Sequence, residues 1–138
     1  MNFGQFYQDG GVFMHVITLL SIFTAAGLLH RCGAIRGGSR GPRERLVKLS
    51  RTGAVAPSML AAIVMVGLLG TSLGWVSVNA ALPSIDPEHW DIASARGYKI
   101  VPYPLVWSLI CAAPLTLAHG LLRHFEQRLR GLVEAYGA

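Results

Sequence analysis

Three long stretches of the chain contain no charged side chain and are mostly apolar, and they lie at residues 11–30, 54–82 and 101–122. A helix needs about 20 mostly apolar residues to cross the roughly 30 Å of hydrocarbon in a bilayer. The pattern therefore predicts an all-α membrane protein whose single membrane domain, residues 1–138, contains three transmembrane helices. The middle stretch is longer than required, so we expect it to tilt or to extend beyond the headgroups.

Charged residues are concentrated between these stretches, and their distribution predicts the orientation of the chain. Segment 31–53 holds seven lysines and arginines, whereas segment 83–100 holds two. Lys and Arg are in excess in the short cytoplasmic loops of membrane proteins. We therefore expect a cytoplasmic loop at 31–53, an outer loop at 83–100 and an N-terminus outside the membrane. The C-terminal tail, 123–138, is then cytoplasmic.

The tail is expected to extend the third helix into the cytoplasm. Its sequence, RHFEQRLRGLVEAYG, has a helical periodicity of apolar residues. Glu126 and Arg130 are spaced to form an ion pair one helical turn apart. Pro114 lies earlier in the same helix, where it removes one intrahelical hydrogen bond and leaves the carbonyl of Ile110 free. We expect a kink at that position.

Composition supports a membrane protein and restricts the classes of partner. Hydrophobic residues make up 52% of the chain and charged residues 14%, whereas soluble domains average about 25% charged residues. The formal net charge is +5. Because the basic residues form a block beside a predicted span, we attribute this charge to membrane topology. We therefore expect a lipid bilayer, and no nucleic acid, as a partner.

Residues that carry catalysis are not grouped in a recognisable pattern. Asp and Glu are absent from all three apolar stretches, and the chain has no CxxC motif and no convincing Ser/His/Asp set. The five histidines include no pair at i,i+4 spacing within one stretch, which is the spacing expected of metal ligands on a helix. The sequence therefore predicts no enzyme, no metal and no cofactor.

The second apolar stretch carries a face of small residues. In GLLGTSLGWVSVNAAL, Gly67, Gly70, Gly74 and Ser77 follow one another at steps of three or four residues. In lipid such a face lets another helix approach closely, because van der Waals packing replaces the hydrophobic drive of water. Thr71, Ser72 and Asn79 lie beside this face. Because an unpaired Asn79 that faces lipid would be costly, we expect this side of the helix to face protein or a wet cavity.

The same stretch resembles a known signature. GLLGTSLG, residues 67–74, is similar to the GLLGTVxG sequence in the second membrane helix of the MotA/TolQ/ExbB proton-channel family. The first predicted span with its trailing Arg31 is similar to the first helix of that family, which commonly ends in a Glu-Arg pair; here His30 precedes the Arg. Ala113 and Pro114, followed by a His-Gly and a basic extension, resemble the third helix. The resemblance covers all three predicted spans.

The resemblance implies a short ExbB/TolQ-like channel-forming stator subunit in the bacterial inner membrane, part of a motor or energy-transducing complex driven by the proton-motive force. In this family the subunit forms a pentamer around an ExbD/TolR-like single-span protein, which supplies the titrating Asp. Thr71 matches the Thr of the signature, where the family places a pore-facing hydroxyl. Ser108 would be a second hydroxyl on the ion pathway, while the three glycines, Ser77 and Pro114 would serve helix packing.

Two departures leave a second hypothesis open. Upstream of Pro114 the family has a Glu and a Thr-Ala-x-Gly stretch, where this chain has Ile100, Leu105 and Ser108. The loop at 31–53 is also much shorter than the corresponding region of typical family members.

A proton relay in a membrane needs an ionisable group, and since the spans contain no Asp, Glu, Lys or Arg, the carboxylate must come from another chain. The alternative is a structural or assembly subunit of a membrane complex that conducts no ions.

Overall fold

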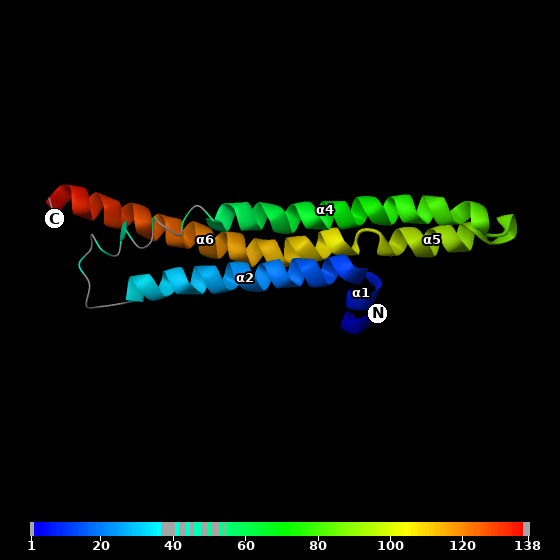
Figure 1. Ribbon diagram of the computed structural model, residues 1–138, viewed down its shortest axis with the longest axis horizontal. Helices are drawn as coiled ribbons and strands as arrows, with labels where there is room; N and C mark the ends of the chain where they lie inside the picture. The colour runs from blue at the N-terminus through cyan, green and yellow to red at the C-terminus, as the bar shows by residue number, and fades with distance from the viewer. Residues whose placement is uncertain are drawn as a thin grey trace. The chain divides into compact units, whose positions relative to one another are not determined.

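The regular elements of this computed structural model are helices throughout the residues that it describes, which are 2–36, 41, 44, 46–47, 50, 53 and 55–136. The prediction of an all-α fold is therefore confirmed for this part of the chain. Figure 1 shows three long helices, α2, α4 and α6, with shorter elements before and between them. The elements are α1 (Phe3–Asp9), α2 (Gly11–Arg36), α4 (Val55–Ala81), η1 (Leu82–Ser84), η2 (Pro87–His89), α5 (Trp90–Ile100) and α6 (Tyr103–Tyr136).

In the part of the chain that the structure describes, three helical segments are long and apolar enough to cross a membrane, as predicted. They are Gly11–Gly33, Val55–Ser84 and Pro87–Ala135. Large apolar side chains are exposed along them, with Leu29 at 70% and Leu117 at 71% of full exposure. An apolar surface this extensive is unfavourable in water. The length, composition and surface of these helices fit a multi-pass membrane protein.

The segment predicted as an outer loop, 83–100, is mostly helical. Two prolines occupy the first turns of η1 and η2, positions where the missing N–H of proline costs nothing. Helix α5 then continues to Ile100 and α6 begins at Tyr103, with Pro102 in the gap between them. The expectation of a loop at 83–100 did not include these helical turns or α5.

The C-terminal part of α6 agrees with the prediction for the tail. The helix runs through Pro114 to Tyr136 without interruption, and the Nη2 atom of Arg130 lies 2.8 Å from Oε1 of Glu126. The predicted ion pair is thus confirmed. The loop predicted at 31–53 falls largely outside the described residues, although α2 itself continues to Arg36.

The chain divides into two compact units, to each of which α2, α4 and α6 contribute. Unit 1 comprises Met1–Leu19 and Ile63–Cys111, and unit 2 comprises Leu20–Ala62 and Ala112–Ala138. Unit 1 has the most completely buried side chains, which are Met14, Ile17, Ile63 and Ser108. In unit 2, Leu28, Ala56 and Leu122 form a buried cluster, with Leu115 and Ala118 packed against it.

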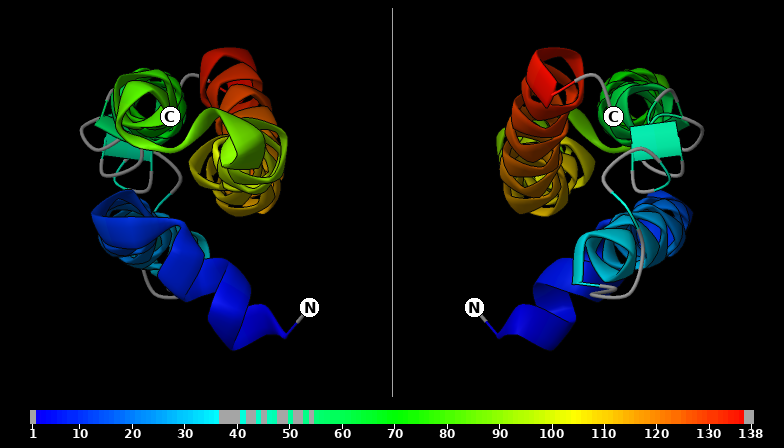
Figure 2. Two further views of the ribbon diagram at one scale, coloured as in Figure 1. Left: turned by 90° about the vertical axis from the view of Figure 1, so that its right-hand side faces the viewer. Right: turned by 90° about the vertical axis from the view of Figure 1, so that its left-hand side faces the viewer.

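Helix α5 packs on the end of α4 within unit 1, so that α4 lies alongside α5 and the beginning of α6 (Figures 1 and 2). The rings of Trp75 and Tyr98 are 4.9 Å apart, and the hydroxyl of Tyr98 donates to Oδ1 of Asn79 at 2.9 Å. A Cβ at Gly97 would lie only 2.9 Å from Val78. The polar Asn79 is therefore satisfied by a neighbouring helix of the same chain.

Candidate functional site

The small-residue face of α4 is occupied by side chains of the same chain. An added Cβ at Gly67 would overlap the side chain of Ser108, and one at Gly70 would lie 2.9 Å from both Phe13 and Pro104. Distances below 3.0 Å cannot be accommodated without movement of one partner. Helices α2 and α6 thus approach α4 closely because these two positions have no side chain.

The fit becomes looser toward the end of the face. A Cβ at Gly74 would meet Val101 at 3.5 Å, which is ordinary van der Waals contact. Ser77 is exposed, and its hydroxyl donates to the main-chain carbonyl four residues earlier at 2.8 Å. Close packing is therefore strict at Gly67 and Gly70 and relaxed beyond them. Oligomerisation through this face stays a prediction, since its tightest part is filled within one chain.

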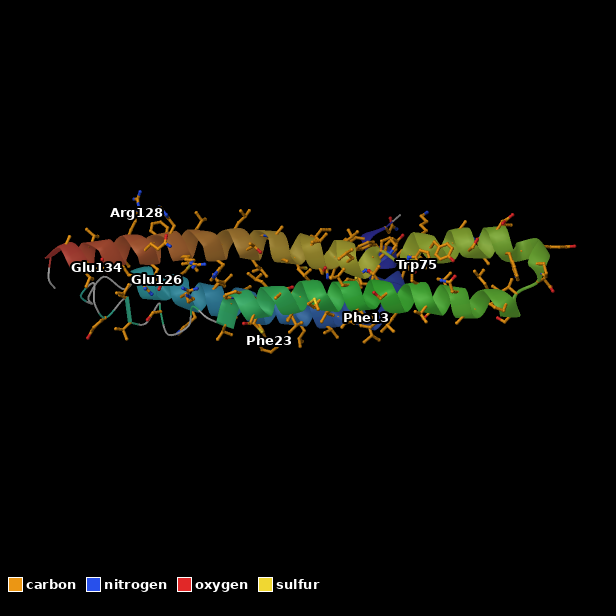
Figure 3. All side chains as sticks on the ribbon, turned by 90° about the horizontal axis from the view of Figure 1, so that it is seen from above. Phe13, Phe23, Trp75, Glu126, Arg128 and Glu134 are labelled. Atoms are coloured by element: carbon orange, nitrogen blue, oxygen red, sulfur yellow. The ribbon has the colours of Figure 1, made fainter. Side chains whose placement is uncertain are left out.

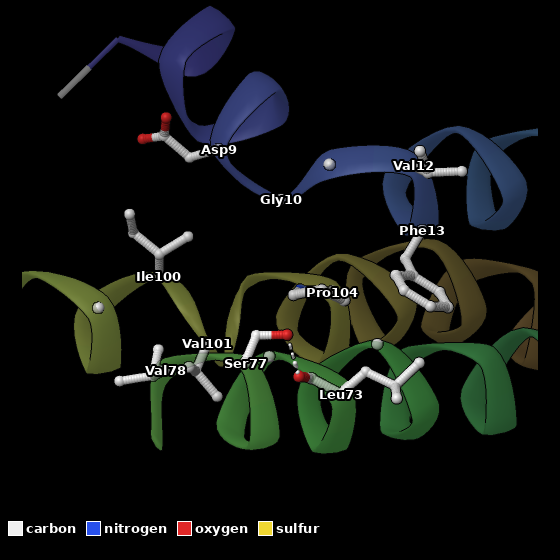
Figure 4. A pocket seen from close by; sticks show the side chains of 14 residues that line it. Asp9, Gly10, Val12, Phe13, Leu73, Ser77, Val78, Ile100, Val101 and Pro104 are labelled. Atoms are coloured by element: carbon white, nitrogen blue, oxygen red, sulfur yellow. Dashed lines mark hydrogen bonds between the residues drawn. The ribbon is translucent and has the colours of Figure 1, made fainter. Parts of the chain in front are cut away.

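A groove of about 440 Å³ opens beside the relaxed end of this face (Figure 4). Gly70, Gly74 and Ser77 form its α4 side, and Val101 lies across from them. Gly11, which begins α2 after α1, has a φ of +67°, a conformation that glycine adopts without strain. This turn brings Asp9 to the lining of an otherwise largely apolar groove.

Thr71 differs from five other hydroxyls on the described helices. Its Oγ1 atom is buried and has no hydrogen-bond partner among the described residues. The usual arrangement is donation to the carbonyl four residues earlier, which is made by Thr18, Thr24, Ser72, Ser77 and Thr116. A buried polar group left unsatisfied costs about 1–3 kcal/mol. Thr71 therefore places an uncompensated hydroxyl beside the glycine face.

Ser108, the second predicted pathway residue, has a different environment. It is completely buried, and its hydroxyl donates to the carbonyl of Leu105 at 2.8 Å. Its side chain fills the space left by Gly67. The hydroxyl of Ser108 is thus already satisfied within α6. Pro114, which was predicted to serve helix packing, lies in unit 2 and is exposed.

A polar centre at Thr18 was not foreseen from the sequence. Its hydroxyl donates to the carbonyl of Met14 at 2.7 Å and accepts from the indole N–H of Trp107 at 3.0 Å. The hydroxyl of Tyr7 lies 3.1 Å away, and because the Thr18 proton is already used, Tyr7 donates. Rings of Phe3 and Phe6 pack around Trp107. A tryptophan in an apolar span needs a hydrogen-bond partner for its N–H. The position of Trp107 in the third apolar stretch could therefore have indicated a polar partner such as Thr18.

A second polar cluster lies in unit 2 and contains a buried ion pair. Arg31, only 2% exposed, donates from Nη2 to Oε2 of Glu126 at 3.2 Å. Its Nη1 lies 3.4 Å from Nδ1 of His119. The other carboxylate oxygen of Glu126 accepts from Arg130. Sequence reasoning found the pair on α6 but not the long-range pair with Arg31.

No protein-family model, curated protein or solved structure matches this chain. The functional assignment therefore rests on the contacts of the described residues and on the sequence GLLGTSLG. Of the predicted site residues, the structure brings Gly67 and Ser108 into contact, and it places Thr71 one turn along α4 from Gly67.

Proposed function

We propose that this chain is a channel-forming stator subunit of a motor or energy-transducing complex driven by the proton-motive force, and that ions pass along the side of α4 that carries Thr71. The observation that carries the proposal is the buried Oγ1 of Thr71, which has no hydrogen-bond partner in the described part of the chain. A hydroxyl can both donate and accept a hydrogen bond. The Thr71 hydroxyl could therefore hydrogen-bond to a neighbouring carboxyl group in both its protonated and its deprotonated state.

The titrating group is supplied by another chain in this proposal. The apolar stretches 11–30, 54–82 and 101–122 contain no Asp, Glu, Lys or Arg, and proton transfer across a membrane needs an ionisable group. An ExbD/TolR-like single-span protein with an intramembrane Asp would provide it, surrounded by a pentamer of this chain. Partner and stoichiometry come from the resemblance of GLLGTSLG to the family signature.

Thr71→Val tests the proposal, because it keeps the shape of the side chain and removes the hydroxyl. We expect proton flux to fall about ten-fold or more, since a hydrogen bond to a charged group contributes roughly 1.5–3 kcal/mol. The complex, purified through a tag on this chain, would be reconstituted in vesicles carrying a proton gradient. Thr71→Ser is the matched control, because it retains the hydroxyl and should retain most of the flux.

Stability gives a second measurement on the same variants. Removing an unsatisfied hydroxyl from a buried position is neutral or stabilising, so Thr71→Val should unfold no more easily than the wild type. Loss of flux together with preserved stability supports a role in conduction. Unchanged flux in Thr71→Val would refute that role for Thr71.

The alternative is a structural or assembly subunit without ion conduction. The contact between Ser108 and Gly67 favours it, because the hydroxyl of Ser108 is satisfied by Leu105 and its side chain serves packing. In that case the purified complex would contain no protein with an intramembrane carboxylate. Mass spectrometry of the complex that is used for the flux measurement separates the two hypotheses.

Orientation is a part of the proposal that can be tested separately. With a cytoplasmic 31–53 segment, a cysteine introduced at Ser39 should react with impermeant thiol reagents only after the cells are opened. Ser39 lies outside the described residues. A cysteine at Ser94 in α5 should react in intact cells whose outer barrier is permeable. The reverse labelling pattern would contradict an outer N-terminus and the proposed inner-membrane topology.

A further inference from the structure

Unit 2 contains a cavity of about 300 Å³ with an excess of positive charge in its lining. Among the described residues that line it, Arg31, Arg123 and Arg130 are the arginines and Glu126 is the only carboxylate. His119 completes the titratable side chains that line it. With three positive charges and one negative charge, the cavity favours an anion.

The inner wall of the cavity is held by hydrogen-bonded charges. Both carboxylate oxygens of Glu126 are engaged, one by Arg31 at 3.2 Å and one by Arg130 at 2.8 Å. Arg31 is 2% exposed, and a Cβ at Gly53 would lie 3.4 Å from its Nη2 atom. Gly53 therefore lies directly over the ion pair, and Glu126 has no free oxygen to neutralise a further arginine.

Two of the three arginines present charge at the surface. Arg123 is exposed and forms no ion pair with any residue that the structure describes. The side chain of Arg130 is 54% exposed even though it contacts Glu126. Arginine guanidinium groups bind phosphate oxygens in a bidentate, charge-assisted manner. The rim of the cavity thus offers donors to a phosphate group approaching from outside.

The cavity lies near one end of each of the first two candidate spans and next to the end of the third charge-free stretch. Arg31 is close to the end of the segment Gly11–Gly33, and Pro57, which also lines the cavity, is close to the beginning of Val55–Ser84. Arg123 is the first charged residue after the apolar stretch 101–122. Residues at the ends of membrane spans are at headgroup depth, where basic pockets between helices bind anionic lipid headgroups.

We propose that this cavity binds the phosphate group of one anionic phospholipid, with Arg123 and the exposed part of Arg130 as its donors. The buried pair of Arg31 and Glu126 holds the wall against which the headgroup rests. The site goes beyond the proposed function, because it involves neither Thr71 nor ion conduction.

The test uses the full chain in a neutral detergent, with bound lipid counted by native mass spectrometry during titration with phosphatidylglycerol. Arg123→Gln should weaken binding about five-fold, since one basic residue near a membrane surface contributes about 1 kcal/mol toward anionic lipid. Arg128→Gln is the matched control. Arg128 is on the same helix and exposed, and its side chain points away from the helices (Figure 3). We expect the control to change binding by less than about two-fold.

Parallel titrations identify the source of the phosphate. Phosphatidylcholine, which has no net charge, should be retained far less than phosphatidylglycerol, and inorganic phosphate should not displace the bound lipid. Displacement by inorganic phosphate at similar concentrations would overturn the assignment to a lipid. Equal weakening in Arg128→Gln would also overturn the site, because it would indicate attraction to the whole basic surface. Thr71→Val should leave all of these titrations unchanged, so the two proposals fail independently.

Discussion

Gly70→Leu should destabilise unit 1 by about 3 kcal/mol or more, at or above the upper end of the cost of overfilling a packed core. Even the first carbon of a side chain at this position would lie 2.9 Å from both Phe13 and Pro104. A leucine would force α4 away from α2 and α6. Unfolding of the detergent-solubilised chain by SDS titration, followed by circular dichroism, measures the change in the free energy of unfolding.

Gly74→Ala is the control, because it adds a side chain to the same face where space exists. The new Cβ would lie 3.5 Å from Val101, and alanine favours a helix over glycine by about 1 kcal/mol. We expect this variant to be as stable as the wild type or slightly more stable. Equal destabilisation in the two variants would contradict the graded fit of the glycine face.

The oligomeric state of Gly70→Leu gives a further distinction. Because small residues let helices of separate copies approach closely as well, we expect this substitution to break an assembly of several copies. The substitution would act on the assembly indirectly, because displacement of α4 within one chain would disturb any surface that its helices present to another copy. Native mass spectrometry in mild detergent should show fewer subunits than in the wild type. A wild type that is monomeric would contradict oligomerisation, and a variant with the wild-type number would show that the Gly70 contact does not control assembly.

The helices themselves could be predicted because membrane spanning leaves a strong signal in composition. Charge-free stretches at 11–30 and 54–82 correspond to the apolar segments Gly11–Gly33 and Val55–Ser84. The Glu126 and Arg130 pair followed from helical spacing alone. Helix α5 was missed because segment 83–100 lies between two charge-free stretches and was therefore expected to be a loop, although a segment outside an apolar stretch can also be helical.

The contacts of the site could not be predicted, because they depend on which helix faces which. Spacing identified a small-residue face on α4 but not that Ser108, Phe13 and Pro104 fill it. Arg31 and Glu126 are 95 residues apart in sequence, and no local pattern links them. Nor did the sequence show that Thr71 has no hydrogen-bond partner among the described residues, because the neighbouring Ser72 bonds to its own helix.

Glu126→Ala should destabilise unit 2 by about 3 kcal/mol, because breaking a buried ion pair leaves one charge buried without its counter-ion. Arg31 is 2% exposed and would lose the carboxylate that lies 3.2 Å from its Nη2 atom. Arg130→Gln is the control, since it removes the second, more exposed partner of the same carboxylate. An exposed pair one helical turn apart contributes only about 0.3–0.5 kcal/mol. SDS titration of both variants measures the difference.

A double variant separates the effect of losing the ion pair from the effect of losing side-chain volume. Arg31→Met combined with Glu126→Leu replaces two buried charges by apolar side chains, a change that is often neutral or stabilising by about 1–4 kcal/mol. We therefore expect the double variant to recover most of the stability that Glu126→Ala loses. If it is as unstable as Glu126→Ala, the loss arises from packing around α6, and the charge of Arg31 is not its cause. Recovery would show that Glu126→Ala is destabilising because it leaves the charge of Arg31 buried without a counter-ion. It would also show that unit 2 can be stable without the ion pair.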